Sequence, residues 1–140
     1  VCNQCKEKKG TCSIKDDMET IRPKLKEADA IIVSSPVYFG SMSAQLKALF
    51  DRTLPLRRNN FQLKDKIGAA IAIGGSRNGG QELTIQGIHA AMHVNGMIVV
   101  GDNSHFGGTV LNPFESDDFG KGTIDGTLNK IFSLLNKLKK

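Results

Sequence analysis

Three short apolar segments, each separated from the next by a segment of helical periodicity, constrain the fold of this chain most strongly. They cover residues 30–35, 66–73 and 97–100 and are rich in isoleucine, valine and alanine, without alternating polar residues. Apolar runs of this kind are typical of strands buried on both faces, and strands that alternate with helices pair in parallel. The sequence therefore predicts an α/β protein built on a parallel sheet.

Helices are expected around these strands. Residues 16–28 carry an apolar stripe at Ile21, Leu25 and Ala28, and further helices are expected over about 43–52 and 81–94. The segment 101–122 is rich in glycine and predicts a loop, after which Thr123 or Asp125 caps a final helix. The 140 residues fit one domain, which we place at 1–140.

Composition and charge limit the classes of partner. No apolar run reaches the length of about 18 residues that a membrane span needs, so we expect no membrane partner. The net charge is +5, which favours either a nucleic-acid site or an ordinary solvated surface. Because the basic residues are not interleaved with aromatic ones, we expect no nucleic-acid partner.

All three cysteines lie near the start of the chain, at Cys2, Cys5 and Cys12. An odd number excludes a closed set of disulfides within one chain, and the cysteine-free remainder fits a reducing, cytoplasmic location. Two cysteines separated by two residues can share a metal ion or an iron–sulfur cluster. A redox-active dithiol and inert thiols are the alternatives.

Three loops are expected to form a ligand site. In an open parallel sheet ligands bind beyond the carboxyl ends of the strands, where this chain carries 36–42, 74–82 and 101–108. Tyr38 and Phe39 offer apolar faces, and the glycines of the second loop let backbone N–H groups approach a ligand closely. This combination suits a flat aromatic cofactor that gains charge on reduction. The alternative is that the glycines only make turns.

Two other patterns are interpreted as surface features. His89 and His93 are four residues apart, which is a metal-ligand spacing, but they share a helix face with Glu82 and predict a solvated polar face. Asp117 and Asp118 are adjacent in a loop and are not expected to bind a cation.

Several runs resemble a known family. Residues 28–52, which read ADAIIVSSPVYFGSMSAQLKALFDR, resemble the signature of the flavodoxin-like NAD(P)H-dependent FMN reductases, and more narrowly their iron–sulfur flavoprotein branch. The runs GGSRNGGQE at 74–82 and GMIVVG at 96–101 are similar to the second flavin loop and the last core strand of that branch. Residues 2–18 are similar to its cluster region.

This resemblance implies a three-layer α/β/α flavodoxin-like fold with a five-stranded parallel sheet, here lacking the usual first two strands. It also implies bound FMN, an iron–sulfur cluster as a second cofactor, and a homodimer or homotetramer with flavin sites near subunit interfaces. Carried onto this chain, the residues expected to bind FMN are Pro36, Val37, Tyr38, Phe39, Gly40, Ser41, Met42, Gly74, Gly75, Ser76, Arg77 and Gly80, with His105 as a further contact. The expected metal ligands are Cys2, Cys5 and Cys12.

The chain departs from the family pattern in two places. The branch uses four cysteines, whereas Lys8 stands here where the third would be. A cluster with a non-cysteine ligand, a degraded cluster and no cluster all remain open. In addition, the strand, phosphate-binding loop, helix and second strand with which the family begins do not precede Val1, so we expect an N-terminally incomplete domain.

The resemblance implies an FMN-dependent oxidoreductase that passes electrons from NAD(P)H through FMN to flavin, quinone or another acceptor. One alternative is an electron carrier that exchanges electrons with ferredoxin, and another is a non-catalytic basic binding module. No side-chain acid or base is obligatory for hydride transfer to a flavin, so the sequence assigns no catalytic residue.

Overall fold

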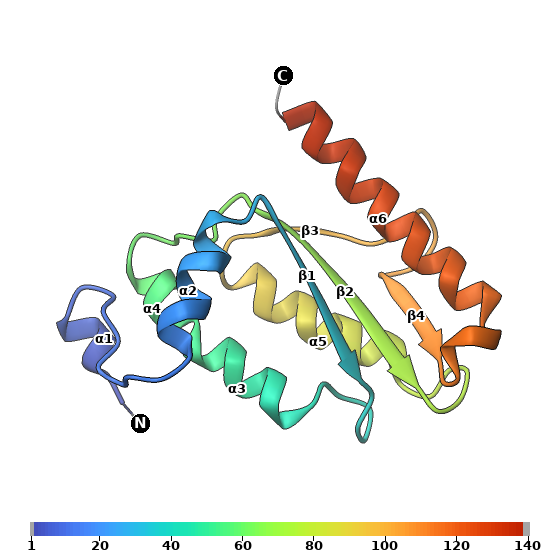
Figure 1. Cartoon of the computed structure of the whole chain (residues 1–140), viewed down its shortest axis with the longest axis horizontal. Helices are drawn as coiled ribbons and strands as arrows, with labels where there is room; N and C mark the ends of the chain where they lie inside the picture. The colour runs from blue at the N-terminus through green and yellow to red at the C-terminus, as the bar shows by residue number, and fades with distance from the viewer. Residues whose placement is uncertain (1, 139–140) are drawn as a thin grey trace.

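The computed structural model describes residues 2–138 and confirms a parallel sheet flanked by helices (Figure 1). The elements in chain order are α1 (Gln4–Glu7), α2 (Met18–Glu27), β1 (Ala30–Pro36), α3 (Ala44–Arg52), α4 (Leu54–Arg58), β2 (Ile67–Gly74), α5 (Gln81–His93), β3 (Ile98–Val100), β4 (Gly108–Leu111), a 3₁₀ turn (Phe114–Ser116) and α6 (Asp118–Leu138).

The central strand of the sheet is β2. Strand β1 pairs with it in parallel along its whole length, from Ala30 opposite Ile67 to Pro36 opposite Ile73. On its other side β2 pairs first with β3 and then, further along, with β4, both in parallel. Strands β3 and β4 thus continue one another along the same side of β2, and residues 101–107 leave the sheet between them. Strand β4 lies within the segment predicted to be a loop.

Helices cover the two faces of the sheet, which gives the three layers of the predicted fold. On one face, Ala70 and Ala72 of β2 belong to a buried cluster with Ile85, Ile88 and Met92 of α5, and side chains of α2 and α3 pack against it. On the other face, Ile67 and Ala69 pack against Ile131 of α6. The fully buried alanines let the helices approach the sheet closely.

The last helix begins earlier than predicted, at Asp118 rather than after Thr123 or Asp125. The reason is a different N-cap, because the Asp117 carboxylate accepts a hydrogen bond from the Gly120 amide at 3.0 Å. Gly120 is required there, since a Cβ at this position would collide with that carboxylate. The Thr123 hydroxyl instead accepts from the Thr109 amide at 3.0 Å and so ties α6 to β4.

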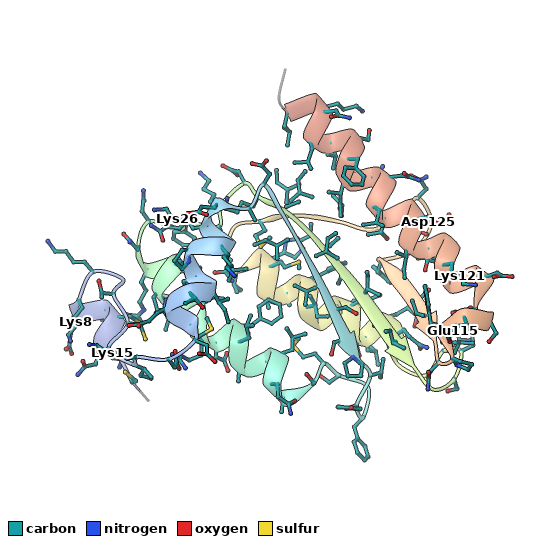
Figure 2. The ribbon with its side chains drawn as sticks, in the orientation of Figure 1. Lys8, Lys15, Lys26, Glu115, Lys121 and Asp125 are labelled. Atoms are coloured by element: carbon teal, nitrogen blue, oxygen red, sulfur yellow. The ribbon has the colours of Figure 1, made fainter. Side chains whose placement is uncertain are left out.

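Charged side chains of both signs are spread over the surface. Figure 2 shows Lys8, Lys15 and Lys26 around α1 and α2, whereas Lys121 shares the C-terminal part of the fold with Glu115 and Asp125. None of the helices within residues 2–138 is long and apolar enough to cross a membrane.

Candidate functional site

The loops that follow β1 and β2 meet at two glycines. Gly80 has a φ of +107°, and a Cβ there would stand 2.9 Å from Cα of Gly40 and 3.2 Å from Cγ1 of Val37. Only glycine can combine this backbone angle with such a close approach. Two of the three loops predicted to converge therefore do so, at the carboxyl end of the sheet.

The first loop ends in a tight turn that carries two exposed aromatic side chains. Tyr38 and Ser41 exchange backbone hydrogen bonds of 2.9 and 3.1 Å, and Phe39 at the tip has a φ of +50°. The Phe39 side chain is fully exposed, and that of Tyr38 is largely exposed. A bulky residue in this strained conformation with its ring in solvent indicates a contact surface rather than a packing role.

Both ends of this loop are fixed to the sheet. The Val37 amide donates to the Ile73 carbonyl at 2.9 Å, and the Ser43 amide donates to the hydroxyl of the buried Ser35 at 3.0 Å. Ser43 also caps α3, because its hydroxyl accepts from the Leu46 amide at 3.3 Å. The loop is thus held in place beside the N-terminus of α3.

The second loop is open on one side and supported on the other. Within residues 2–138 no atom lies within 4 Å of the position that a Cβ would take at Gly75, whereas at Gly74 that position is filled by the Gln81 carboxamide. Gln81 is buried, and its amide nitrogen donates to the Ser76 carbonyl at 2.8 Å. The backbone of 74–76 is therefore open at Gly75 and supported by the Gln81 side chain at Gly74 and Ser76.

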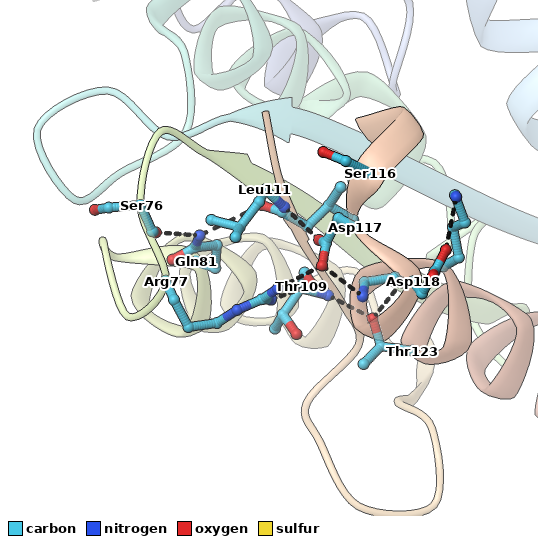
Figure 3. A network of polar contacts seen from close by, with 12 residues as sticks. Ser76, Arg77, Gln81, Thr109, Leu111, Ser116, Asp117, Asp118 and Thr123 are labelled. Atoms are coloured by element: carbon cyan, nitrogen blue, oxygen red, sulfur yellow. Dashed lines mark hydrogen bonds and ion pairs between the residues drawn. The ribbon is translucent and has the colours of Figure 1, made fainter. Parts of the chain in front are cut away.

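Arg77 in the same loop is paired with Asp117 (Figure 3). Its guanidinium also donates to the Thr109 carbonyl at 3.3 Å and lies 4.8 Å from the centre of the Phe119 ring. This pairing directs the side chain toward β4 and α6, so that a contact of Arg77 with a cofactor would come from its backbone. The sequence analysis missed this role of Asp117, because two adjacent carboxylates in a loop do not indicate which of them is paired.

The Asp117 carboxylate is buried among hydrogen-bond donors. It accepts from the Leu111 amide at 2.7 Å and from the Gly120 amide at 3.0 Å. Burial pushes the pKa of Asp117 up, but these two amides and the Arg77 guanidinium outweigh it and hold the pKa below its ordinary value. Asp117 is therefore a structural anion that joins β4, α6 and the second loop.

The third predicted loop lies elsewhere. Strand β3 ends at Val100 beside the middle of β2, and β4 begins at Gly108 further along the same side of β2. Residues 101–107 therefore leave the middle of the sheet. The segment that follows its carboxyl end is 112–117. His105 Nδ1 lies 2.8 Å from Asp102 Oδ2, and its ring contacts Phe119 edge-on at 5.4 Å. The expected convergence of 101–108 with the other two loops was wrong, and a contact of His105 with the cofactor stays a prediction.

The histidines of α5 also differ from expectation. His93 is exposed, but His89 is half-buried, and its Nε2 atom has no hydrogen-bond partner among the described residues. Burial lowers the pKa of His89, and His93 adds to the effect. Both line a cavity of about 490 Å³ together with His105 and Phe106, so the prediction of a fully solvated face was wrong for His89.

The three cysteines gather around one small cavity, of about 130 Å³, between α1 and the C-terminal end of α3. Cys5 is buried, Cys12 is partly buried and Cys2 is exposed. Arg52 lines the same cavity, binds Asp16 through two hydrogen bonds of 2.6 and 2.9 Å, and has Nη2 4.0 Å from Cys12 Sγ. Within residues 2–138, no group of three or more histidine, cysteine, aspartate or glutamate side chains could hold a metal ion.

Comparison with known proteins decides the family. The model of a family described as NADPH-dependent FMN reductase matches residues 1–109. The chain belongs to this FMN reductase family. It is also 55% identical over 139 residues to an iron-sulfur flavoprotein of Methanosarcina thermophila, covering 99% of this chain and 72% of that protein. An iron-sulfur flavoprotein of Methanocaldococcus jannaschii is 50% identical over 146 residues, covering 99% and 75%. These relatives place the chain in the iron–sulfur flavoprotein branch.

A solved structure supports the fold independently. A flavodoxin, WrbA-like protein from Agrobacterium tumefaciens superposes with a TM-score of 0.68 at 21% identity, over 89% of this chain and 76% of that one. Likeness at this identity concerns the fold alone, and it confirms the flavodoxin-like, three-layer arrangement. The FMN reductase family also confirms the expectation of an oxidoreductase that uses FMN.

The two cofactors expected of this chain fit its residues to different degrees. The open backbone at Gly75, the glycine contact between the loops and the exposed rings of Tyr38 and Phe39 fit a flat isoalloxazine ring. The cysteines fit an iron–sulfur cluster only in part. They line one cavity, but a full set of four thiolates is not available from three cysteines.

The surroundings of Cys12 lower the pKa of its thiol. A hydrogen bond from the Ile14 backbone lowers its pKa, burial opposes this, and the guanidinium groups of Arg52 and Arg22 lower it further. We expect Arg52→Gln to slow the alkylation of Cys12 by iodoacetamide at pH 7.5 several-fold, because the thiolate is the reacting species. Peptide mass spectrometry over time measures the rate.

The matched control for this prediction is Lys47→Gln, which removes a cation from the same helix. Lys47 pairs with Asp51, and both side chains are exposed. The alkylation rate of Cys12 should be the same in this variant and in the wild type. An equal slowing in both variants would show that overall charge, rather than Arg52, controls the thiol.

Proposed function

We propose that this chain binds the FMN ring between the loops 36–42 and 74–80 and passes electrons from NAD(P)H through it to flavin, quinone or another acceptor. The observation that carries the proposal is the contact of the two loops at Gly40 and Gly80, the first of which lies in a loop that also carries the exposed side chains of Tyr38 and Phe39. Membership of the FMN reductase family supports the same conclusion.

The chain's own residues would bind and orient the ring. Tyr38 and Phe39 offer apolar surface to one side of it, and Gly75 lets the backbone approach its edge without steric hindrance. Met42 and Ser43 bring the N-terminus of the nine-residue helix α3 next to the same loop, where the helix dipole favours negative charge. FMN, when bound, supplies one-electron and two-electron redox chemistry.

A second candidate function is electron exchange with a ferredoxin-type partner, through a cluster held at Cys2, Cys5 and Cys12. Its support is the shared cavity of the three thiols and the iron-sulfur flavoprotein names of the two methanogen relatives. The positive Arg52 beside Cys12 would offset the negative charge of thiolate ligands. We further propose a cytoplasmic homodimer or homotetramer.

Anaerobic reduction kinetics separate the two functions. The purified protein is first titrated with FMN, and flavin fluorescence quenching gives the affinity. The loaded protein is then mixed in a stopped-flow instrument with NADPH, NADH or reduced ferredoxin, and bleaching of the flavin band is followed. Rapid bleaching by a nicotinamide is the expected result.

Two other results would decide against this proposal, and a third measurement tests the cluster of the second candidate. Bleaching by ferredoxin alone would favour the electron carrier. Failure to bind FMN would refute both functions. Iron and acid-labile sulfide below one equivalent per chain after anaerobic purification would refute the cluster.

A further inference from the structure

The Gln81 side chain packs against the loop 74–80, which is one of the two loops proposed to bind the ring. It is the first residue of α5, its side chain is almost completely buried, and it reaches back under the loop that precedes it. Its amide nitrogen donates to the Ser76 carbonyl at 2.8 Å and to the Val110 carbonyl of β4 at 3.3 Å (Figure 3). One carboxamide therefore connects α5, the loop and the neighbouring strand.

The orientation of this carboxamide follows from its partners. Both contacts are made to carbonyl oxygens, which only accept, so the nitrogen must face them and the oxygen must face away. The Gln81 oxygen is buried and has no hydrogen-bond partner within the described residues. Leaving a buried acceptor unpaired is unfavourable, so the two hydrogen bonds donated by the nitrogen decide this orientation.

The contact with the Ser76 carbonyl fixes the direction of the next amide group. In a trans peptide the C=O and N–H bonds point in opposite directions. Because the Ser76 carbonyl points down to Gln81 and also accepts from the Gly79 amide at 3.2 Å, the N–H group of Arg77 points away from Gln81. This N–H group belongs to the same loop as the open Gly75.

We propose that Gln81 is a positioning residue that sets the Ser76–Arg77 peptide so that its N–H group faces the electron-rich edge of the bound ring. An N–H donor at that edge stabilises the negative charge of the reduced flavin, so Gln81 acts on the redox potential without touching the ring. This inference rests on the proposed function, because it needs FMN at the loops 36–42 and 74–80.

Two substitutions test the role, Gln81→Glu and Gln81→Met. A carboxylate is similar in shape but cannot donate to the two carbonyls, and methionine preserves apolar packing without a donor. We expect both variants to bind FMN roughly tenfold more weakly, a change of about 1.4 kcal/mol. We also expect the midpoint potential of their bound FMN, measured at full saturation, to be more negative than in the wild type.

The matched control is Gln86→Glu, the same change at an exposed position of the same helix. Its FMN affinity and potential should equal those of the wild type. Urea unfolding of each FMN-free variant reports the purely structural effect of the change. A Gln81→Met protein with reduced stability but an unchanged potential would overturn the proposal.

Failure of the underlying function gives a different result. If the wild type and Gln86→Glu bind no FMN, the proposed function itself is refuted, and this inference with it. If both bind FMN and Gln81→Met does so with the same affinity and potential, only the role of Gln81 is refuted.

Discussion

Gly75→Val is expected to weaken FMN binding roughly hundredfold, which corresponds to about 2.7 kcal/mol, while the FMN-free protein stays folded. Among the described residues no atom lies within 4 Å of the Cβ position at Gly75, and its φ is not in the left-handed region, so a Cβ is tolerated there. The added side chain would instead occupy the space in which the ring lies. Fluorescence titration with FMN measures the affinity, and circular dichroism on heating measures the stability.

Two other glycines provide controls. Gly122 in α6 is equally open, so Gly122→Ala should leave FMN affinity unchanged and raise the free energy of unfolding by up to about 1 kcal/mol. Gly80→Ala should lower both affinity and stability, because alanine would press on Gly40 at a strained φ. An unchanged FMN affinity in Gly75→Val would mean that the ring does not lie at this loop.

Asp117→Ala is expected to produce the largest loss of stability, lowering the thermal midpoint by on the order of 10 °C. The substitution leaves the amides of Leu111 and Gly120 without their acceptor, removes the partner of Arg77 and deletes the N-cap of α6. Asp118→Ala is the matched control, since its side chain is almost fully exposed and pairs with the partly exposed Lys121 at 2.9 Å. It should shift the midpoint by a degree or two at most. Equal shifts would contradict the role of Asp117.

The effect of Asp117 should also depend on pH. Its pKa in the folded protein is lowered from the ordinary value of 3.8, so the carboxylate contributes stability that is fully present above that value. The contribution is lost as the pH falls through the folded pKa. The difference in thermal midpoint between wild type and Asp117→Ala should therefore be largest above about pH 5 and shrink below about pH 4. A constant difference down to pH 3 would mean that the carboxylate is not selectively stabilised by folding.

The main frame of the fold could be predicted from local sequence. The apolar runs at 30–35 and 66–73 became β1 and β2, because uninterrupted β-branched and small apolar residues suit a strand covered on both faces. The loops after these strands could also be located, since parallel strands present their carboxyl ends at one edge. The contact between Gly40 and Gly80 was seen only in the structure, because the sequence analysis assigned the glycines of the second loop to ligand approach.

The missed features depend on contacts between distant residues. Strand β4 is four residues long and begins with glycine, so only its pairing with β2 reveals it. The expected convergence of the loop that carries His105 failed for the same reason, because the sequence indicates that the last strand ends at Gly101. The early start of α6 depends on the fit of Gly120 against Asp117, whereas glycine in sequence indicates a helix break.

The interruption between β3 and β4 gives the sheet two unlike margins. One margin consists of segments of only three and four residues with a loop between them, and such a broken row of peptide groups is a poor template for strand addition. The other is the seven-residue β1, continuous and with Ile32 exposed. Within the described part of the chain, growth of the sheet by a further strand is therefore directional. It is favoured at β1 and obstructed at the opposite margin, where the break acts as a safeguard against edge-to-edge aggregation.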